Sequence, residues 1–250
     1  MRRRSFVRTA GIIGAALATR PFSSLLRAAE GPTNASVQSD SPIKLTPPKT
    51  GKIAVAFPIS PGVTVIDFAG PWEVFQDVMV PERGPSMEDH VPFQLFTVAE
   101  KNGTIEGSGG LKLVPDFTFD DAPTPRLVVV PAQRGSPALH EWLRKVSKTT
   151  DLTMSVCTGA FQLGRAGLLD GKVATTHHDF FEDFENEFPR TKVRRDARFV
   201  EDGAISTAAG LSSGIDLALR VVERYFGRQI AERTAAYMEY QGKAWITQKP

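Results

Sequence analysis

The chain has 250 residues, of which 41% are hydrophobic, enough to fill one large α/β domain or two small ones. Its net charge of +2 depends on residues 1–29, which hold six arginines and no acid; the rest of the chain carries a net charge of −4. Because no basic stripe is left, the composition does not indicate a nucleic-acid partner. A single cysteine excludes an intramolecular disulfide and a metal site made of several thiolates.

Residues 1–29 are predicted to form an export signal. Arg3 and Arg4 begin a segment that resembles the twin-arginine signal, and an apolar stretch follows at residues 11–18. That stretch is shorter than the ~20 apolar residues that span a bilayer. We therefore expect a periplasmic or secreted protein without a stable membrane anchor; a disordered basic tail is the alternative. Residues 30–50, rich in Pro, Ser and Thr, predict a linker to a domain at residues 51–250.

Short apolar runs alternate with helical patterns after residue 50. The expected strands are 52–57, 93–99, 127–130, 152–156 and 173–176, with two short strands around a turn at Asp202-Gly203 and a hairpin-like excursion at 107–114. The expected helices are 71–79, opened by Gly70-Pro71, then 137–146, one after Cys157, 179–188, 212–225 and 229–240. This alternation predicts an α/β fold, a flavodoxin-like sandwich whose mostly parallel sheet has helices on both faces.

The apolar run at 152–156 ends in Cys157, followed by Thr158-Gly159 and a helical pattern. Strand, sharp turn and helix is the layout of a nucleophile elbow, which presents a reactive atom at the carboxyl end of a strand. A helix N-terminus favours thiolate, so we expect a lowered pKa for Cys157. The alternative is a buried structural cysteine, which packs like a small hydrophobic residue.

Four blocks of sequence, in order, resemble the ThiJ/PfpI superfamily of the class I glutamine amidotransferase-like fold. They are Asp67–Phe75, Ser155–Ala160, the pair Gly167–Gly171 with Ala174–His177, and Thr207–Leu219. The resemblance spans about residues 51–240 and is greatest to the isonitrile hydratases and to sensor domains of AraC-type regulators. Those regulators carry a helix-turn-helix module after this point. Because ten residues follow Tyr240, we expect no such module and no DNA binding.

The resemblance implies that Cys157 is the nucleophile and that Asp67 is a carboxylic acid that reaches its sulfur. A carboxyl there could hydrogen-bond the sulfur and pass protons to and from substrate or water. The alternative role for Asp67 is to cap the helix that follows. Thr158 is expected to supply a backbone N–H that stabilises an anion, and a second N–H is expected from the loop after Val130.

The expected substrate pocket also includes Ala132, Gln133, His177 and Gly70. Ala132-Gln133 stands where the family has Gly-Gly, so the loop is expected to differ in shape if either position needs a positive φ. His177 is interpreted either as a base or pocket residue, or as a hydrogen-bonded structural residue. The four histidines do not form a helical metal pair, so we expect no metal and no cofactor.

The resemblance favours a cysteine-dependent hydratase or hydrolase that turns an isonitrile into an N-substituted formamide. Thr158 follows the nucleophile where the family's peptidases have histidine, which argues against proteolysis. A non-catalytic sensor of oxidants or electrophiles is the alternative from another class, and a glyoxal-handling activity is the third. A small-molecule substrate and a homodimer are the expected partners, the dimer by resemblance and because symmetric dimers are the commonest oligomers.

Overall fold

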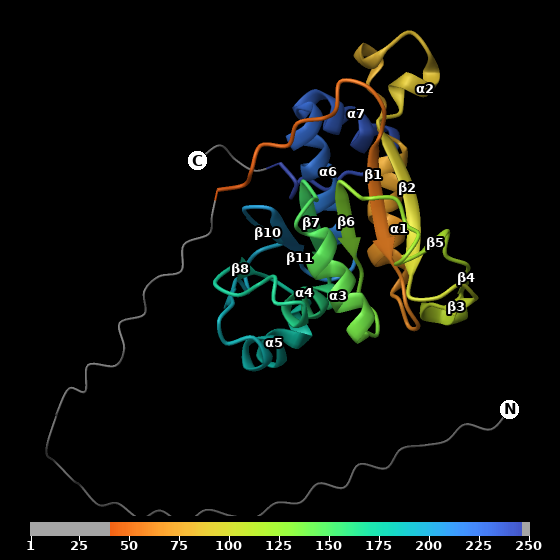
Figure 1. The fold of residues 1–250 in the computed structure, drawn as a ribbon. Helices are drawn as coiled ribbons and strands as arrows, with labels where there is room; N and C mark the ends of the chain where they lie inside the picture. The colour runs from red at the N-terminus through yellow and green to blue at the C-terminus, as the bar shows by residue number, and fades with distance from the viewer. Residues whose placement is uncertain (1–40, 247–250) are drawn as a thin grey trace, which may run out of the picture. The chain divides into compact units, whose positions relative to one another are not determined.

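The computed structural model describes residues 41–246 and has a seven-stranded sheet at its centre, in the order β10-β11-β7-β6-β1-β2-β5 (Figure 1). All neighbouring strands are parallel except β10 and β11, which form an antiparallel hairpin. The strands are β1 Ile53–Pro58, β2 Phe93–Ala99, β5 Phe117–Thr118, β6 Leu127–Val130, β7 Leu152–Val156, β10 Phe199–Asp202 and β11 Ile205–Ala208. The predicted flavodoxin-like fold is therefore confirmed.

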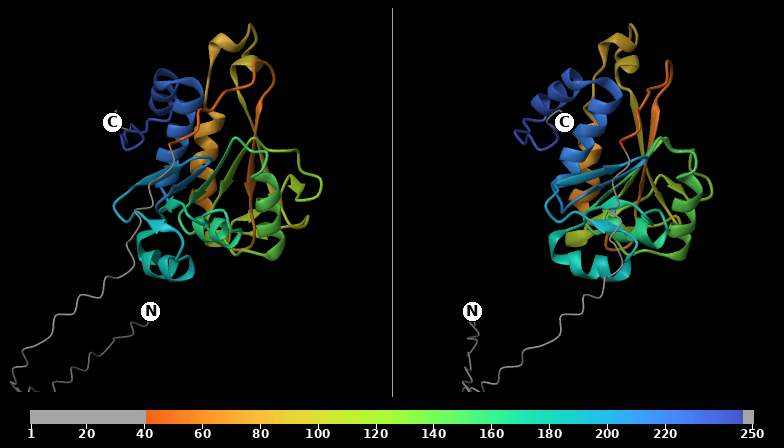
Figure 2. Two further views of the ribbon diagram at one scale, coloured as in Figure 1. Left: turned by 60° about the vertical axis from the view of Figure 1, so that its left-hand side comes forward. Right: turned by 90° about the vertical axis from the view of Figure 1, so that its left-hand side faces the viewer.

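Helices cover both faces of this sheet (Figure 2). On one face lie α1 Val65–Gln76, α6 Ser213–Phe226 and α7 Arg228–Tyr237, which share a core with Ile53, Val55 and Phe57 of β1. On the other lie α3 Pro137–Val146, α4 Gly159–Arg165 and α5 Phe181–Glu187, packed with Ala56 of β1 and Val128 and Val130 of β6. Successive strand residues point to opposite faces, so a continuous apolar run supplies both cores.

Several short strands and helices lie outside the central sheet. A hairpin of β3 Ile105–Glu106 and β4 Lys112–Leu113 confirms the predicted excursion. The strand expected at 173–176 is only β8 Val173–Ala174, and it pairs with β9 Lys192–Val193 in a separate two-stranded sheet. The segment between α1 and β2 contains the 3-10 helix η1 Pro81–Arg83 and the short helix α2 Met87–His90, whose capping box is formed by Ser86 and Asp89. The remaining 3-10 helices are η2 Ser108–Gly110 and η3 His178–Phe180.

Helix α1 begins six residues before the predicted start at Pro71 and contains that proline in its interior. Pro71 has no N–H to give to the carbonyl of Asp67, four residues earlier, which normally disfavours such a position. The helix forms nevertheless because it buries Phe68, Val74 and Phe75 against the sheet. As a result Asp67 lies within the first turn of α1, and not in the loop before it.

Part of the predicted linker lies on the domain. Leu45 is 2% exposed and belongs to the core beneath α6 and α7. Arg224 donates to the carbonyl of Ile43 at 2.7 Å, and Arg126 donates to that of Thr46 at 3.2 Å. Within the predicted linker, the segment around Leu45 therefore contributes to the core. The predicted signal at 1–29 lies outside the described residues.

The direction of winding reverses between β1 and β6 in the centre of the sheet. The chain passes from β1 through α1 to β2 on one side, and from β6 through α3 to β7 on the other. Open α/β sheets bind ligands where the direction of winding reverses in this way. The loops after β1, β6 and β7 meet at this edge. Within residues 41–246, no helix has the length and apolar character needed to cross a bilayer.

Candidate active site

Cys157 occupies the turn between β7 and α4. Its φ is +59°, in the left-handed region that a side chain rarely adopts. Its N–H donates to the carbonyls of Ala208 and Ala209 at the end of β11, at 3.2 and 2.8 Å, which holds this backbone in place. Gly159 follows because a Cβ there would overlap the Val130 carbonyl oxygen. The local sequence thus forms the predicted nucleophile elbow, with a sulfur-bearing residue that is only 7% exposed.

Asp67 lies fully buried beside this cysteine. Its Oδ2 accepts a hydrogen bond of 3.1 Å from the N–H of Ala132. The Cys157 thiol is close enough to lower the carboxyl pKa by hydrogen bonding, although Oδ1 has no partner of ordinary geometry among the described residues. The N-cap of α1 is Thr64. Asp67 is therefore not the cap of this helix, and its carboxyl joins the loop after β6 to the cysteine.

The two groups titrate as a pair. Burial raises the pKa of Asp67 to about 6, against the lowering effect of the Ala132 N–H and the thiol. Burial, and then the negative charge of Asp67, raise the pKa of Cys157 to about 11. This direction is opposite to the predicted acidic thiol, because burial first, and then the charge of Asp67, outweigh the hydrogen bonds that lower the thiol pKa. Between these two values the pair holds one proton, and a shift of that proton from sulfur to carboxylate creates the thiolate.

Two backbone N–H groups, from Thr158 and Leu211, lower the pKa of the Cys157 thiol by hydrogen bonding to its sulfur, as does the Thr158 hydroxyl. Leu211 follows β11 and has a φ of +52°. The sequence analysis missed its amide, since only the pairing of β11 with β7 brings this loop to the cysteine. The block Thr207–Leu219 was the available signal. The sulfur therefore faces donors from two separate loops, an arrangement that stabilises a developing anion.

Ala132 and Gln133 lie in the loop after β6, from which a second anion-stabilising N–H was expected. The Ala132 N–H is already bonded to Asp67, so this amide is engaged; a second N–H from elsewhere in this loop stays a prediction. Neither residue has a positive φ, so the chain accommodates them without the expected strain. Gln133 donates from Nε2 to the Pro58 carbonyl at 2.9 Å, and its Oε1 is buried without a hydrogen-bond partner. Gln133 thus ties the loop after β6 to the end of β1.

Gly70, expected in the pocket, lies between α1 and α6. A Cβ at this position would lie 3.0 Å from Cγ1 of Ile215. The absence of a side chain there allows the two helices to approach closely. Its contact with α6 gives Gly70 a packing role, and its expected place in the pocket stays a prediction.

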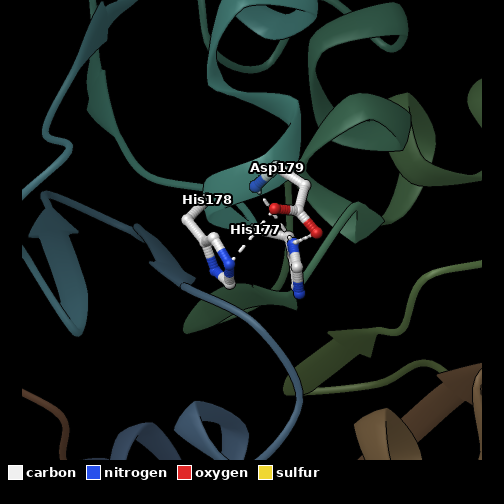
Figure 3. Close-up of side chains that lie close together, drawn as sticks. All are labelled: His177, His178 and Asp179. Carbon is white, nitrogen blue, oxygen red and sulfur yellow. Dashed lines mark hydrogen bonds and ion pairs between the residues drawn. The ribbon is translucent and has the colours of Figure 1, made fainter. Parts of the chain in front are cut away.

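His177 borders the loop that contains Leu211. A Cβ on Gly210 would overlap its ring, and its Nδ1 accepts the Asp179 N–H at 3.2 Å. Figure 3 shows His177, His178 and Asp179 together, with one potential ligand atom from each within 4.8 Å of the others. Because Nδ1 of His177 is already an acceptor and the other two side chains are largely exposed, we assign no ion to this cluster. The expectation of no metal stays a prediction.

A neighbouring cavity of about 430 Å³ opens at the same edge of the sheet. It is lined by the segments after β1, β2 and β6, among them Ser60, Lys101 and Arg134. Cys157 is not part of its lining. The cavity and the cysteine are thus separate features of this edge of the sheet.

The fold and the site define a class: a parallel α/β protein with a buried cysteine on a nucleophile elbow and a carboxyl beside it. Within that class, the chain belongs to the DJ-1/PfpI family, whose model matches residues 53–224. The chain is 30% identical over 194 residues to an isonitrile hydratase of Pseudomonas putida, covering 75% of this chain and 78% of that protein.

Other relatives share the same fold. The chain is 29% identical over 144 residues to the HTH-type transcriptional regulator CdhR of Pseudomonas aeruginosa, covering 56% of this chain and 43% of the regulator's length. Among solved structures, a ThiJ/PfpI family protein from Pseudomonas syringae matches with a TM-score of 0.65 and 24% identity, covering 87% of this chain and 83% of that one. Oxidized DJ-1 from Toxoplasma gondii matches with a TM-score of 0.62 and 19% identity, covering 76% and 100%.

Proposed function

We propose that the protein is a cysteine-dependent hydratase that converts an isonitrile into an N-substituted formamide. The observation that carries this proposal is the buried Asp67–Cys157 pair, which holds one proton over the neutral pH range. The similarity to an isonitrile hydratase over three quarters of the chain supports the choice of substrate class. The pair supplies both a nucleophile and an acid–base group whose pKa lies near working pH, as such catalysis requires.

The reaction proceeds in two stages. In the first, the Asp67 carboxylate accepts the thiol proton while the sulfur of Cys157 forms a bond to the terminal carbon of R–N≡C. Asp67 returns that proton to the same carbon, which leaves the thioimidate R–N=CH–S–Cys157. The N–H groups of Thr158 and Leu211 stabilise the negative charge on sulfur before the attack.

Water then completes the conversion. Asp67, again a carboxylate, accepts a proton from the water that adds to the thioimidate carbon and passes it to the imine nitrogen. Asp67 then takes the hydroxyl proton of the adduct as the carbon–sulfur bond breaks, R–NH–CHO leaves, and Asp67 returns that proton to the sulfur. The sum is R–N≡C plus water giving R–NH–CHO, with no change in oxidation state of the enzyme and no demand for a metal.

The deciding experiment incubates the purified protein with alkyl and aryl isonitriles and measures the formamide by mass spectrometry. We expect many product molecules per enzyme, and none from Cys157→Ala. Absence of formamide with every isonitrile would overturn the proposal. Methylglyoxal in a parallel incubation tests the glyoxal-handling alternative, which predicts its consumption with turnover.

The similarity to a transcriptional regulator favours a second candidate, a non-catalytic sensor that captures one oxidant or electrophile per cysteine. A thiol whose pKa is raised to about 11 is a poor sensor, because the thiolate is the reactive form. Stoichiometric loss of the thiol without turnover would support this candidate over the hydratase.

The proposal also includes a homodimer, which light scattering of the purified protein should show as twice the chain mass; a single chain mass at micromolar concentration would contradict it.

A further inference from the structure

The segment Ala209–Ser212, here called the sulfur loop, connects β11 to α6 and touches Cys157 twice. The Ala209 carbonyl accepts the Cys157 N–H at 2.8 Å. The Leu211 N–H reaches the sulfur, from a residue held at a φ of +52°. Leu211 is itself exposed, so its own side chain is not buried in the core. Other residues must therefore keep this loop in position.

Arg198, just before β10, forms hydrogen bonds with both ends of the sulfur loop. Its carbonyl accepts the Ala209 N–H at 3.0 Å, and its Nη2 donates to the Ser212 hydroxyl at 3.0 Å. Its Nε donates to Oδ2 of Asp216 at 2.5 Å, in the first turn of α6. A single planar guanidinium thus joins the loop to the helix that follows, using the fork geometry that lysine lacks.

The same contact compensates a buried charge at the start of α6. Asp216 is fully buried in the first turn of α6. Without a partner, its negative charge would cancel part of the positive potential at this end of the helix. Arg198 compensates this charge, and Tyr240 also reaches both side chains. His177 packs against Gly210 on the other side of the loop. Together with Cys157, these are the charged and titratable groups that the described residues place against the loop and its anchor.

We propose that Arg198 is a positioning residue that holds the Leu211 amide on the Cys157 sulfur through Ser212 and Asp216. This inference rests on the proposed role of Cys157 as nucleophile, but not on the identity of the substrate. Loss of the Arg198 guanidinium should allow the Leu211 amide to move away from the sulfur, and it should deprive Asp216 of its ion-pair partner. Both changes destabilise the thiolate.

The test measures the rate of Cys157 alkylation by iodoacetamide between pH 6 and 11 in Arg198→Met, Arg198→Lys and Ser212→Ala. We expect Arg198→Met to react about tenfold more slowly at pH 8, the effect of a one-unit rise in thiol pKa. Arg198→Lys should lie between Arg198→Met and the parent, since lysine can pair with Asp216 but cannot also bond Ser212. Ser212→Ala should slow the reaction without removing a charge.

The direction in which the alkylation rate changes distinguishes a loss of positioning from a general loosening of the fold. A loosened fold would expose the buried thiol, so that it would react faster, with a midpoint near the ordinary ~8.5. Arg195→Met is the matched control, because Arg195 pairs with Glu185 on the surface and should leave the profile unchanged. Should Arg198→Met fail to fold, Ser212→Ala decides the question. Parental profiles in both Arg198→Lys and Ser212→Ala would overturn the inference, whether or not isonitriles prove to be substrates.

Discussion

Asp67 Oδ2 accepts a 3.1 Å hydrogen bond from the N–H of Ala132, a residue 65 positions further along the chain. The bond joins the first turn of α1 to the loop after β6. It uses one carboxylate oxygen and so fixes the direction of the other. The carboxyl is thereby oriented at the thiol without any charged partner, which is why burial can raise the pKa of Asp67 to about 6.

Asp67→Asn should abolish turnover while keeping the fold. Loss of a positioned acid–base group typically slows a reaction 10²–10⁴-fold, and the asparagine oxygen can still accept the Ala132 N–H. Kinetics with an identified substrate check the loss, and Gln76→Glu or another change at the exposed end of α1 serves as a control. Full activity in the asparagine variant would contradict the proposed role.

The same variant should alkylate faster than the parent protein at pH 8. Ionised Asp67 raises the pKa of Cys157, so removal of its charge should lower that pKa. If only the helix N-terminus set the pKa of Cys157, Asp67→Asn and the parent protein should alkylate at the same rate. Slower alkylation in Asp67→Asn would show that the carboxyl stabilises the thiolate in the parent.

Stability should depend on pH through Asp67. Its pKa rises from 3.8 to about 6 on folding, so the folded state favours the protonated carboxyl. This contribution is fully present below pH 3.8 and is lost as the pH rises through about 6, a difference of up to about 3 kcal/mol. Asp67→Asn should therefore melt higher than the parent at pH 8. Equal melting temperatures at that pH would argue against a buried carboxylate.

The pH dependence of kcat/KM should rise through about 6, as Asp67 becomes able to accept the thiol proton, and fall near 11, as the pair loses its last proton. Both limbs belong to the coupled pair and not to either residue alone. A rate that is constant from pH 5 to 8 would contradict the assignment of Asp67 as the proton acceptor.

Gly159→Ala should disable the site, because a Cβ there overlaps the Val130 carbonyl and must displace either the elbow or the end of β6. Overpacking of this kind typically costs about 1–3 kcal/mol. Gly167→Ala is the matched control, since Gly167 has a φ of +73° but open space around it. Melting temperature and Cys157 alkylation together should show stability loss in both variants and altered reactivity only in Gly159→Ala.

Export is expected to depend on the arginine pair of the signal. Arg3→Lys with Arg4→Lys should hold the protein in the cytoplasm of the producing cells, whereas Arg20→Lys with Arg27→Lys should not. Immunoblots of periplasmic and cytoplasmic fractions measure the outcome. Undiminished periplasmic protein in the first variant would reject the twin-arginine route.

Local signals predicted most of the fold. The strands at 93–99 and 127–130 are apolar runs bounded by turns, and Ser136 caps α3 as expected, accepting the Leu139 N–H. The start of α1 was missed because Gly70-Pro71 indicates a helix beginning, whereas the burial of Phe68 extends the helix backward. Tertiary contact overrode a local rule at this point.

The sequence identified the main residues of the candidate site, but not the direction in which the pKa of the thiol is shifted. Cys157 and Asp67 could be found from the elbow pattern and the resemblance, and the structure brings them together. The Leu211 amide could not, because it depends on β11 lying beside β7. The direction of the thiol pKa could not be predicted either, because it depends on how deeply both groups are buried.

Leu45 has a practical meaning for anyone who produces this domain. The family match starts at residue 53, which invites a version trimmed to that point. Such a version would lack Leu45, a core residue, and would leave Arg224 without the Ile43 carbonyl that it now bonds. Emptying a buried leucine site typically costs 2–5 kcal/mol, a large share of the stability of an ordinary domain. A domain that starts at residue 41 keeps Leu45 and the Ile43 carbonyl, and should melt at a higher temperature than one that starts at residue 53.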